Sequence, residues 1–207
     1  MIIPAFLETT TAALRKRFSQ VESLRYHIDV MDGSFTPRRT VGAAGLKAIK
    51  PNAFIEAHLM VKDPLKKMPA FVGAIDMVIV HVETLDDVDD YIRNAKRCGL
   101  LVGVAIDPET PLRKISPYAQ WLDRVLIMTV HPGKQGQKFD KKALAKVRLL
   151  RKRFPHLSIG VDGGIHHGTV RMAAKAGADA LVVGSAIVHA DNPMKAFKEL
   201  QAEERGA

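Results

Sequence analysis

Short apolar runs alternate with longer, partly polar segments along the whole chain. The apolar runs are nearly continuous in Val, Ile and Leu, which is typical of parallel strands buried on both faces. They lie at residues 2–7, 24–31, 53–60, 76–82, 100–106, 124–130, 157–162 and 179–184. The segments between them have helical features: TLDDVDDYIRNAKRCG, for example, begins with acidic residues and ends with basic residues and a glycine.

This alternation predicts one α/β domain over residues 1–207. A strand–helix unit recurs about every 26 residues, which is close to the minimum for a barrel repeat. We therefore favour a closed (β/α)8 TIM barrel, while the pattern leaves an open, doubly wound sheet as the alternative. No linker or low-complexity stretch divides the chain.

Composition narrows the class of protein. The sequence is 47% hydrophobic and 26% charged, as in globular proteins with a sizeable core. No apolar stretch approaches the ~18 residues of a membrane span, and MIIPAFLETT lacks the features of a signal peptide, so we expect no membrane association. Cys98 is the only cysteine, which excludes an internal disulfide and a cysteine-cluster metal site and favours a cytoplasmic location.

The formal net charge is +9, which favours anionic partners. The densest basic stretch is KKALAKVRLLRKRF at 141–154. A charge run on a helix is usually a solvated face, and we favour that interpretation of 141–154 over nucleic-acid binding.

Four ionisable residues lie at or near the ends of strand-like runs: His27, Asp29, His58 and Asp162. In a barrel, the C-terminal ends of the strands form one rim, which carries the active site. Charged groups inside a barrel are costly unless they are paired or bind a metal. We therefore predict a divalent-metal site, with a structural hydrogen-bond network as the alternative; two imidazoles and two carboxylates suit zinc, iron, manganese or cobalt better than calcium.

Glycine-rich turns and methionines also occur at the C-terminal ends of the predicted strands. HPGKQGQ (131–137), DGGI (162–165) and VGSAI (183–187) predict backbone N–H groups that bind phosphate, although ordinary turns use glycine too. Met31, Met60 and Met128 also lie at or near the ends of strand-like runs. They either fill the core or form an apolar lid over the metal and substrate.

Several longer segments together resemble the ribulose-phosphate 3-epimerase family, from Ile2 to about Leu200. They occur in the family's order and spacing and read HIDVMDGSFTP, AHLMVKDP, HVET, GVAIDPETP, MTVHPGKQGQKF, VDGGI and VVGSAI. The resemblance implies an isomerase that inverts C3 of a ketose phosphate and interconverts D-ribulose 5-phosphate and D-xylulose 5-phosphate. It also implies a dimer or hexamer of identical chains.

The resemblance assigns roles by position. His27, Asp29, His58 and Asp162 would hold the metal, with zinc as the first choice. Asp29 and Asp162 would form the acid/base pair, one on each face of the substrate, and would transfer the proton through a cis-enediolate. The substrate and phosphate contacts would fall on His58, Gly133, Lys134, Gly136, Gly163, Gly164, Gly184 and Ser185. Met31, Met60 and Met128 would form the substrate lid.

The substrate-binding shell departs from the family's usual pattern. The differences are Ala5 in place of a substrate-contacting serine, and Arg38, His131, Lys134 and Gln135. They are either drift, with Lys134 or Arg38 compensating at the phosphate, or a sign of another substrate such as D-allulose 6-phosphate. We favour the pentose phosphate. A hypothesis of another class is a catalytically weak barrel that binds RNA or an acidic partner through residues 141–154; the intact metal and acid/base residues argue against it.

Overall fold

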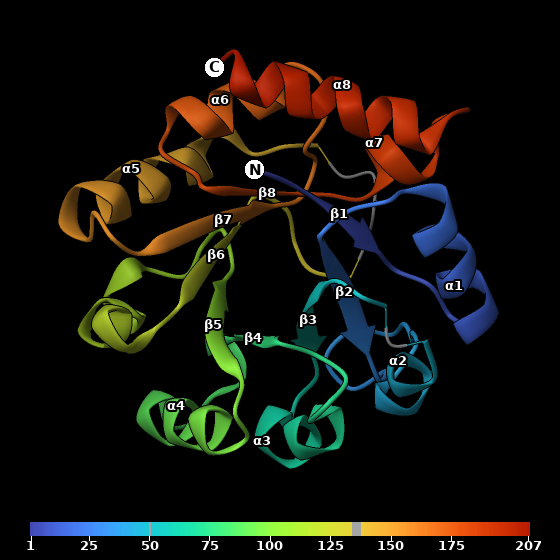
Figure 1. The fold of residues 1–207 in the computed structure, drawn as a ribbon. Coiled ribbons are helices and arrows are strands. Elements are labelled where there is room, and N and C mark those ends of the chain that lie inside the picture. Colours follow the sequence, from blue (N-terminus) through green and yellow to red (C-terminus); the bar gives the residue numbers. More distant parts are fainter. Residues whose placement is uncertain (50, 134–137) are drawn as a thin grey trace.

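Eight parallel strands close into a barrel in sequence order, which confirms the predicted (β/α)8 fold and excludes the open sheet. The computed structural model describes residues 1–49, 51–133 and 138–207. The helices form a ring outside the strands (Figure 1). The strands are β1 (Ile2–Phe6), β2 (Arg25–Met31), β3 (Phe54–Met60), β4 (Met77–His81), β5 (Leu101–Ile106), β6 (Arg124–Met128), β7 (Ser158–Asp162) and β8 (Ala180–Val183).

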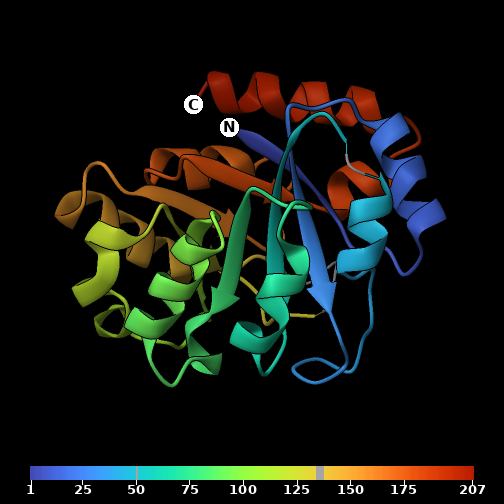
Figure 2. The ribbon, with the colours of Figure 1, turned by 60° about the horizontal axis from the view of Figure 1, so that its bottom comes forward.

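The outer layer consists of α-helices and short 3-10 helices. The α-helices are α1 (Thr11–Gln20), α2 (Ala43–Ile49), α3 (Pro64–Lys67), α4 (Val88–Arg97), α5 (Leu144–Arg153), α6 (Thr169–Lys175), α7 (Ser185–Val188) and α8 (Pro193–Arg205). The 3-10 helices are η1 (Met68–Phe71), η2 (Val82–Thr84), η3 (Leu112–Lys114), η4 (Ser116–Trp121) and η5 (Lys141–Ala143). Figure 2 shows the same layer turned toward the reader, with α8 lying across one end of the molecule.

Local sequence explains where several helices begin and end. The Asp87 carboxylate accepts the backbone N–H groups of Asp89 and Asp90 and so caps the start of α4. Pro69 has no N–H group to continue a helix, and α3 gives way there to η1. Among the described residues, no helix combines the length and apolar character needed to cross a membrane.

Side chains that point into the barrel come from alternate residues of each strand. On β2 and β3 these include ionisable residues, and the strand register sets His27 beside Glu56 and Asp29 beside His58. Asp162 of β7 lies in register with Met128 of β6. A small apolar cluster occupies other interior positions: Ala5, Met77, Ile79, Ala105, Leu126, Met128 and Val182. The register therefore brings polar groups from several strands together inside an otherwise apolar barrel.

Candidate metal centre and substrate pocket

The structure brings all four predicted metal ligands together at the C-terminal rim. One nitrogen or oxygen atom from each of the four side chains lies within 4.8 Å of the others. Oδ1 of Asp29 is 3.4 Å from Nε2 of His27 and 3.4 Å from Nδ1 of His58, and Oδ2 of Asp162 is 3.9 Å from the same His58 nitrogen. Both histidine side chains are fully buried, whereas the two carboxylates are slightly exposed.

Three atoms of this cluster are buried without a hydrogen-bond partner among the described residues: Nε2 of His27, Oδ1 of Asp29 and Nδ1 of His58. Leaving such atoms unpaired costs about 1–3 kcal/mol each. A cation at their centre would satisfy all three at once. The residues present therefore fit a divalent ion, and two imidazoles with two carboxylates are a donor set that zinc and other first-row metals accept.

The pKa values of the two carboxyl groups, Asp29 and Asp162, are shifted in opposite directions. Burial raises the pKa of Asp29, but the neighbouring imidazoles of His27 and His58 outweigh it and hold that pKa well below its usual range. Burial and the nearby Asp29 carboxylate both raise the pKa of Asp162. Without a metal, one carboxyl of the pair is thus ionised where the other holds a proton, which is the arrangement expected of an acid and a base in one site.

The buried ion pair of Glu56 and Arg124 holds the ring of His27 in place. Nδ1 of His27 lies 2.8 Å from Oε1 of Glu56 and donates to it, because a carboxylate can only accept. Oε2 of Glu56 accepts a hydrogen bond from Arg124. Sequence reasoning missed both residues. A signal for Glu56 was available, since it stands two residues before His58 and so points to the same side of β3.

A second group of residues, built around the buried His81, supports His58, and sequence reasoning missed it as well. Nε2 of His58 lies 2.9 Å from Nε2 of His81, at the end of β4. Glu83 and Asp107 lie next to the other nitrogen of His81. The sequence signals were the segments HVET and GVAIDPETP, which end neighbouring strands of the barrel.

A pocket opens directly above the two aspartates. Most of the residues predicted to hold the substrate line it together with Asp29 and Asp162. These are Met31, Met60, Met128, Gly133, Gly163, Gly164, Gly184 and Ser185. Ala5 and His131 line it too. Lys134, Gln135 and Gly136 lie outside the described residues, and Arg38 is exposed and is not one of the described lining residues.

Two positions that line the pocket require glycine, both because of their backbone conformation and because there is no space for a side chain. Gly133 and Gly163 have φ angles of 90° and 109°, a region that side chains disfavour. A Cβ atom at Gly163 would lie 2.4 Å from Cγ2 of Val130, and one at Gly133 would lie 2.7 Å from Cγ2 of Thr36. The pocket can therefore have this shape only with glycine at these positions.

The family model and the sequence relatives of this chain agree on one family. The model of the ribulose-phosphate 3-epimerase family matches residues 1–188. Ribulose-phosphate 3-epimerase of Schizosaccharomyces pombe is 38% identical over 211 residues, covering 97% of this chain and 92% of that protein. The Bacillus subtilis protein of the same name is 35% identical, and the alignment covers 97% of each chain.

A solved structure of lower identity shows the same fold. 3-Hexulose-6-phosphate synthase from Salmonella typhimurium aligns with a TM-score of 0.76 at 24% identity, over 99% of this chain and 98% of the other. This likeness concerns the barrel alone. The family match and the sequence relatives carry the assignment: the chain belongs to the ribulose-phosphate 3-epimerase family of isomerases.

Proposed function

We propose that the protein is a metal-dependent epimerase that interconverts D-ribulose 5-phosphate and D-xylulose 5-phosphate. The observation that carries this proposal is the pair of carboxyl groups, Asp29 and Asp162, which face one pocket beside two buried histidines. The C3–H bond of a 2-ketose is acidic because it lies next to the carbonyl. Epimerisation then needs one group to remove this proton and another to supply a proton on the opposite face.

The opposite pKa shifts of the two aspartates in the metal-free site fit these roles. Ionised Asp29 accepts the C3 proton of one epimer, and protonated Asp162 donates its proton to C3 from the other side. The protons balance, because Asp29 ends protonated and Asp162 ionised, ready for the reverse reaction. A bound divalent ion, zinc as first choice, would supply positive charge to stabilise the cis-enediolate. His27 and His58, with the two aspartates, are the residues that would hold it.

The remaining pocket residues suit the rest of the substrate. Gly163, Gly164, Gly184 and Ser185 line the pocket, where backbone N–H groups can approach a phosphate closely. Lys134 and Gly136 are proposed phosphate contacts on sequence grounds. Three methionines line the pocket beside the aspartates, which supports their role as an apolar lid. Such a lid lowers the polarity around the reacting carbon and strengthens its electrostatic stabilisation.

A second candidate substrate is D-allulose 6-phosphate, which would undergo the same chemistry on a longer chain. The observation in its favour is Ala5, which lines the pocket where a serine is usual in the family. A substrate panel with purified protein of defined metal content, followed by solvent deuterium exchange at C3, separates the two sugars. Higher kcat/KM with the pentose phosphate supports our proposal, and higher kcat/KM with allulose 6-phosphate contradicts the choice of substrate.

Metal dependence is tested separately. We expect chelator-treated protein to lose epimerase activity and zinc, iron, manganese or cobalt to restore it. Full activity in a preparation shown by elemental analysis to contain no divalent metal would contradict the metal site. We further propose a homo-oligomer, a dimer or hexamer, which light scattering on the purified protein would detect; a cytoplasmic location stays a prediction.

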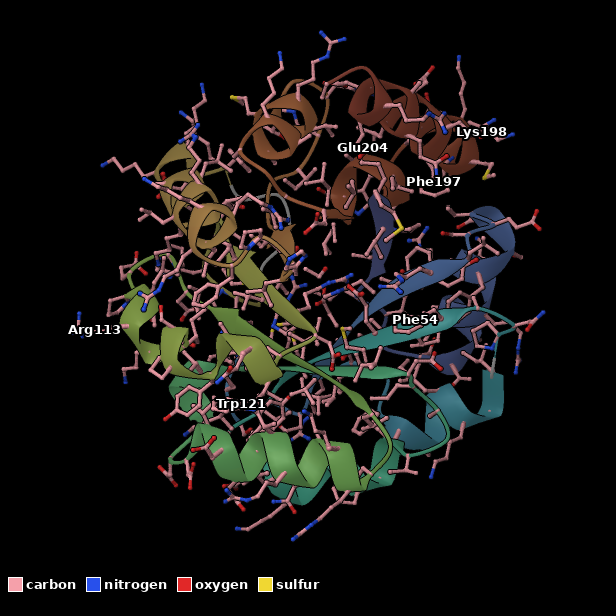
Figure 3. All side chains as sticks on the ribbon, turned by 60° about the vertical axis from the view of Figure 1, so that its left-hand side comes forward. Phe54, Arg113, Trp121, Phe197, Lys198 and Glu204 are labelled. Carbon is pink, nitrogen blue, oxygen red and sulfur yellow. The ribbon has the colours of Figure 1, made fainter. Side chains whose placement is uncertain are left out.

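The hypothesis of an RNA-binding or acidic-partner surface has weaker support. In its favour, a basic and an aromatic residue, Arg113 and Trp121, lie on the outer surface (Figure 3), and Trp121 is 46% exposed. Two of the basic residues of 141–154 are used inside the molecule, however. Lys146 donates to three backbone carbonyls, and Arg151 donates to the carbonyls of Gly177 and Leu157. Salt-sensitive RNA binding by the purified protein would favour this alternative.

A further inference from the structure

His58 lies between two different environments. Its Nδ1 atom faces the proposed metal centre, 3.4 Å from Oδ1 of Asp29. Its Nε2 atom lies 2.9 Å from Nε2 of His81, and the two ring planes differ by only 21°. Both histidines are fully buried, so water does not compete for this contact. Two nitrogens at this distance share one proton, and therefore one ring donates and the other accepts.

The far side of His81 is held by two carboxylates. Its Nδ1 atom lies 3.1 Å from Oδ1 of Asp107 and 3.4 Å from Oε2 of Glu83. Neither contact alone has the geometry of a full hydrogen bond. An N–H group shared between two acceptors accounts for both distances. Glu83 is itself fixed, because its other oxygen accepts the backbone N–H of Asp107 and the hydroxyl of Thr110.

The direction of these contacts follows from counting protons. If Nδ1 of His58 binds a metal, the single proton of this neutral ring must be on Nε2. His81 must then accept that proton's hydrogen bond at its own Nε2 and carry its proton on Nδ1. The two carboxylates, Asp107 and Glu83, are the acceptors that this N–H requires.

We propose that His81 is a positioning residue for the metal centre: held by Asp107 and Glu83, it keeps the proton of His58 on Nε2 and so leaves Nδ1 of His58 available to the metal. This inference rests on the proposed metal-dependent function. It adds to the four proposed ligands a chain of contacts that runs from His58 to His81 and from His81 to Asp107 and Glu83.

The positions of these protons also count against a second metal site around His81. His81, Glu83 and Asp107 also present one ligand atom each within 4.8 Å of one another, as a second metal site would. Metal on Nδ1 of His81 and on Nδ1 of His58 together would place two N–H groups face to face across 2.9 Å. With the first centre filled, the group around His81 therefore acts as a hydrogen-bond acceptor and not as a second site, and each chain binds one ion.

The test measures zinc affinity, by competition with a chelator, on metal-stripped full-length protein. His81→Leu removes the acceptor, and we expect a 10–100-fold loss of affinity. His81→Gln keeps an acceptor and a donor, and we expect it to recover most of that loss. His156→Gln, at an exposed histidine, is the control and should leave affinity unchanged. Circular dichroism and melting of the metal-free proteins report whether the fold survives.

A second measurement tests the carboxylate. Asp107→Ala should weaken zinc binding in the wild-type background and add little when combined with His81→Leu, because it acts through His81. In the zinc-loaded wild type, nitrogen-15 NMR should show protons on Nε2 of His58 and on Nδ1 of His81. The Asp107→Ala single variant and the NMR measurement do not depend on His81→Leu being well folded.

The outcomes separate the inference from the proposed function. If the wild-type protein binds no divalent ion, the metal-dependent function fails. If the wild type binds zinc and His81→Leu and Asp107→Ala bind it equally well, the positioning role of His81 is wrong. A stoichiometry of two zinc ions per chain would establish the second site and overturn the inference in the same way. Equal weakening by His81→Gln and His81→Leu would also contradict it.

Discussion

Nδ1 of His27 lies 2.8 Å from Oε1 of Glu56, and neither side chain is exposed to solvent. The carboxylate therefore fixes the proton on the side of the imidazole that faces away from the pocket. The other nitrogen is left unpaired among the described residues and points toward Asp29. Since Arg124 balances the charge of Glu56, ligand orientation and barrel stability depend on the same buried pair.

Glu56→Leu should destabilise the metal-free protein by about 3–5 kcal/mol, because it leaves the Arg124 guanidinium buried without its partner. We expect the double variant Glu56→Leu/Arg124→Leu to recover only part of this loss: the unpaired Arg124 charge is removed, but His27 and Arg25 still lose their contact with Glu56. Urea unfolding of the three proteins measures both effects. A single variant as stable as the wild type would show that the pair makes no net contribution.

Asp29→Asn and Asp162→Asn should each lower the rate of epimerisation by at least about 10²-fold, because each removes one partner of the proton transfer. Each variant retains one base, so each should still exchange C3–H with deuterated water in one epimer and not in the other. The two variants should prefer opposite epimers. Asp191→Asn, at an exposed aspartate, is the control. Substantial turnover in either variant would contradict the two-base mechanism.

Glu83 makes stability depend on pH. Burial raises the pKa of its carboxyl, but the contact with His81 and the hydrogen bonds from Thr110 and the backbone of Asp107 outweigh burial and lower it from 4.5 to about 2. A pKa that is lower in the folded state contributes stability above pH 4.5, and this contribution is lost as the pH falls toward 2.

Glu83→Gln should therefore flatten the stability profile between pH 4.5 and 2. We expect a difference of about 1–2 kcal/mol, since the carboxyl is partly exposed and solvent screens its interactions. Glu22→Gln, at an exposed glutamate, serves as the control. Chemical unfolding at several pH values gives the comparison, and parallel profiles for Glu83→Gln and the wild type would disprove the contribution.

Gly163→Ala should lower stability by about 1–3 kcal/mol, because its φ angle of 109° is strained for alanine and the new Cβ would collide with Val130. We also expect a higher KM, since Gly163 lines the pocket. Gly42→Ala is the matched control: nothing lies within 4 Å of a Cβ built there. Thermal melting and steady-state kinetics of both variants suffice, and an unchanged KM would remove Gly163 from the substrate contacts.

Lys134→Ala should raise KM several-fold with little change in kcat if Lys134 binds the phosphate, because that contact is the same in substrate and transition state. The sequence alone supports this prediction. Lys138→Ala, at a nearby exposed lysine, controls for the general loss of positive charge. Equal KM values for Lys134→Ala and the wild type would make Lys134 an ordinary surface residue.

The apolar runs predicted the barrel because each strand is buried on both faces. Burial on both faces makes the strand's own sequence almost continuously apolar, so each strand can be recognised by itself. His27, Asp29, His58 and Asp162 were found because they are ionisable residues at strand ends. Their partners were not found, because the contact of Glu56 with Arg124 depends on register and closure around the barrel. No single strand encodes which residues of distant strands will meet.

The pocket and the burial of the two histidines have a consequence for how fast a metal ion exchanges. Asp29 and Asp162 face the pocket, whereas His27 and His58 are closed off from solvent beneath them. An ion held among these four residues would enter and leave through the pocket. A sugar phosphate bound there would block that route, so saturating substrate should slow the loss of metal to a chelator.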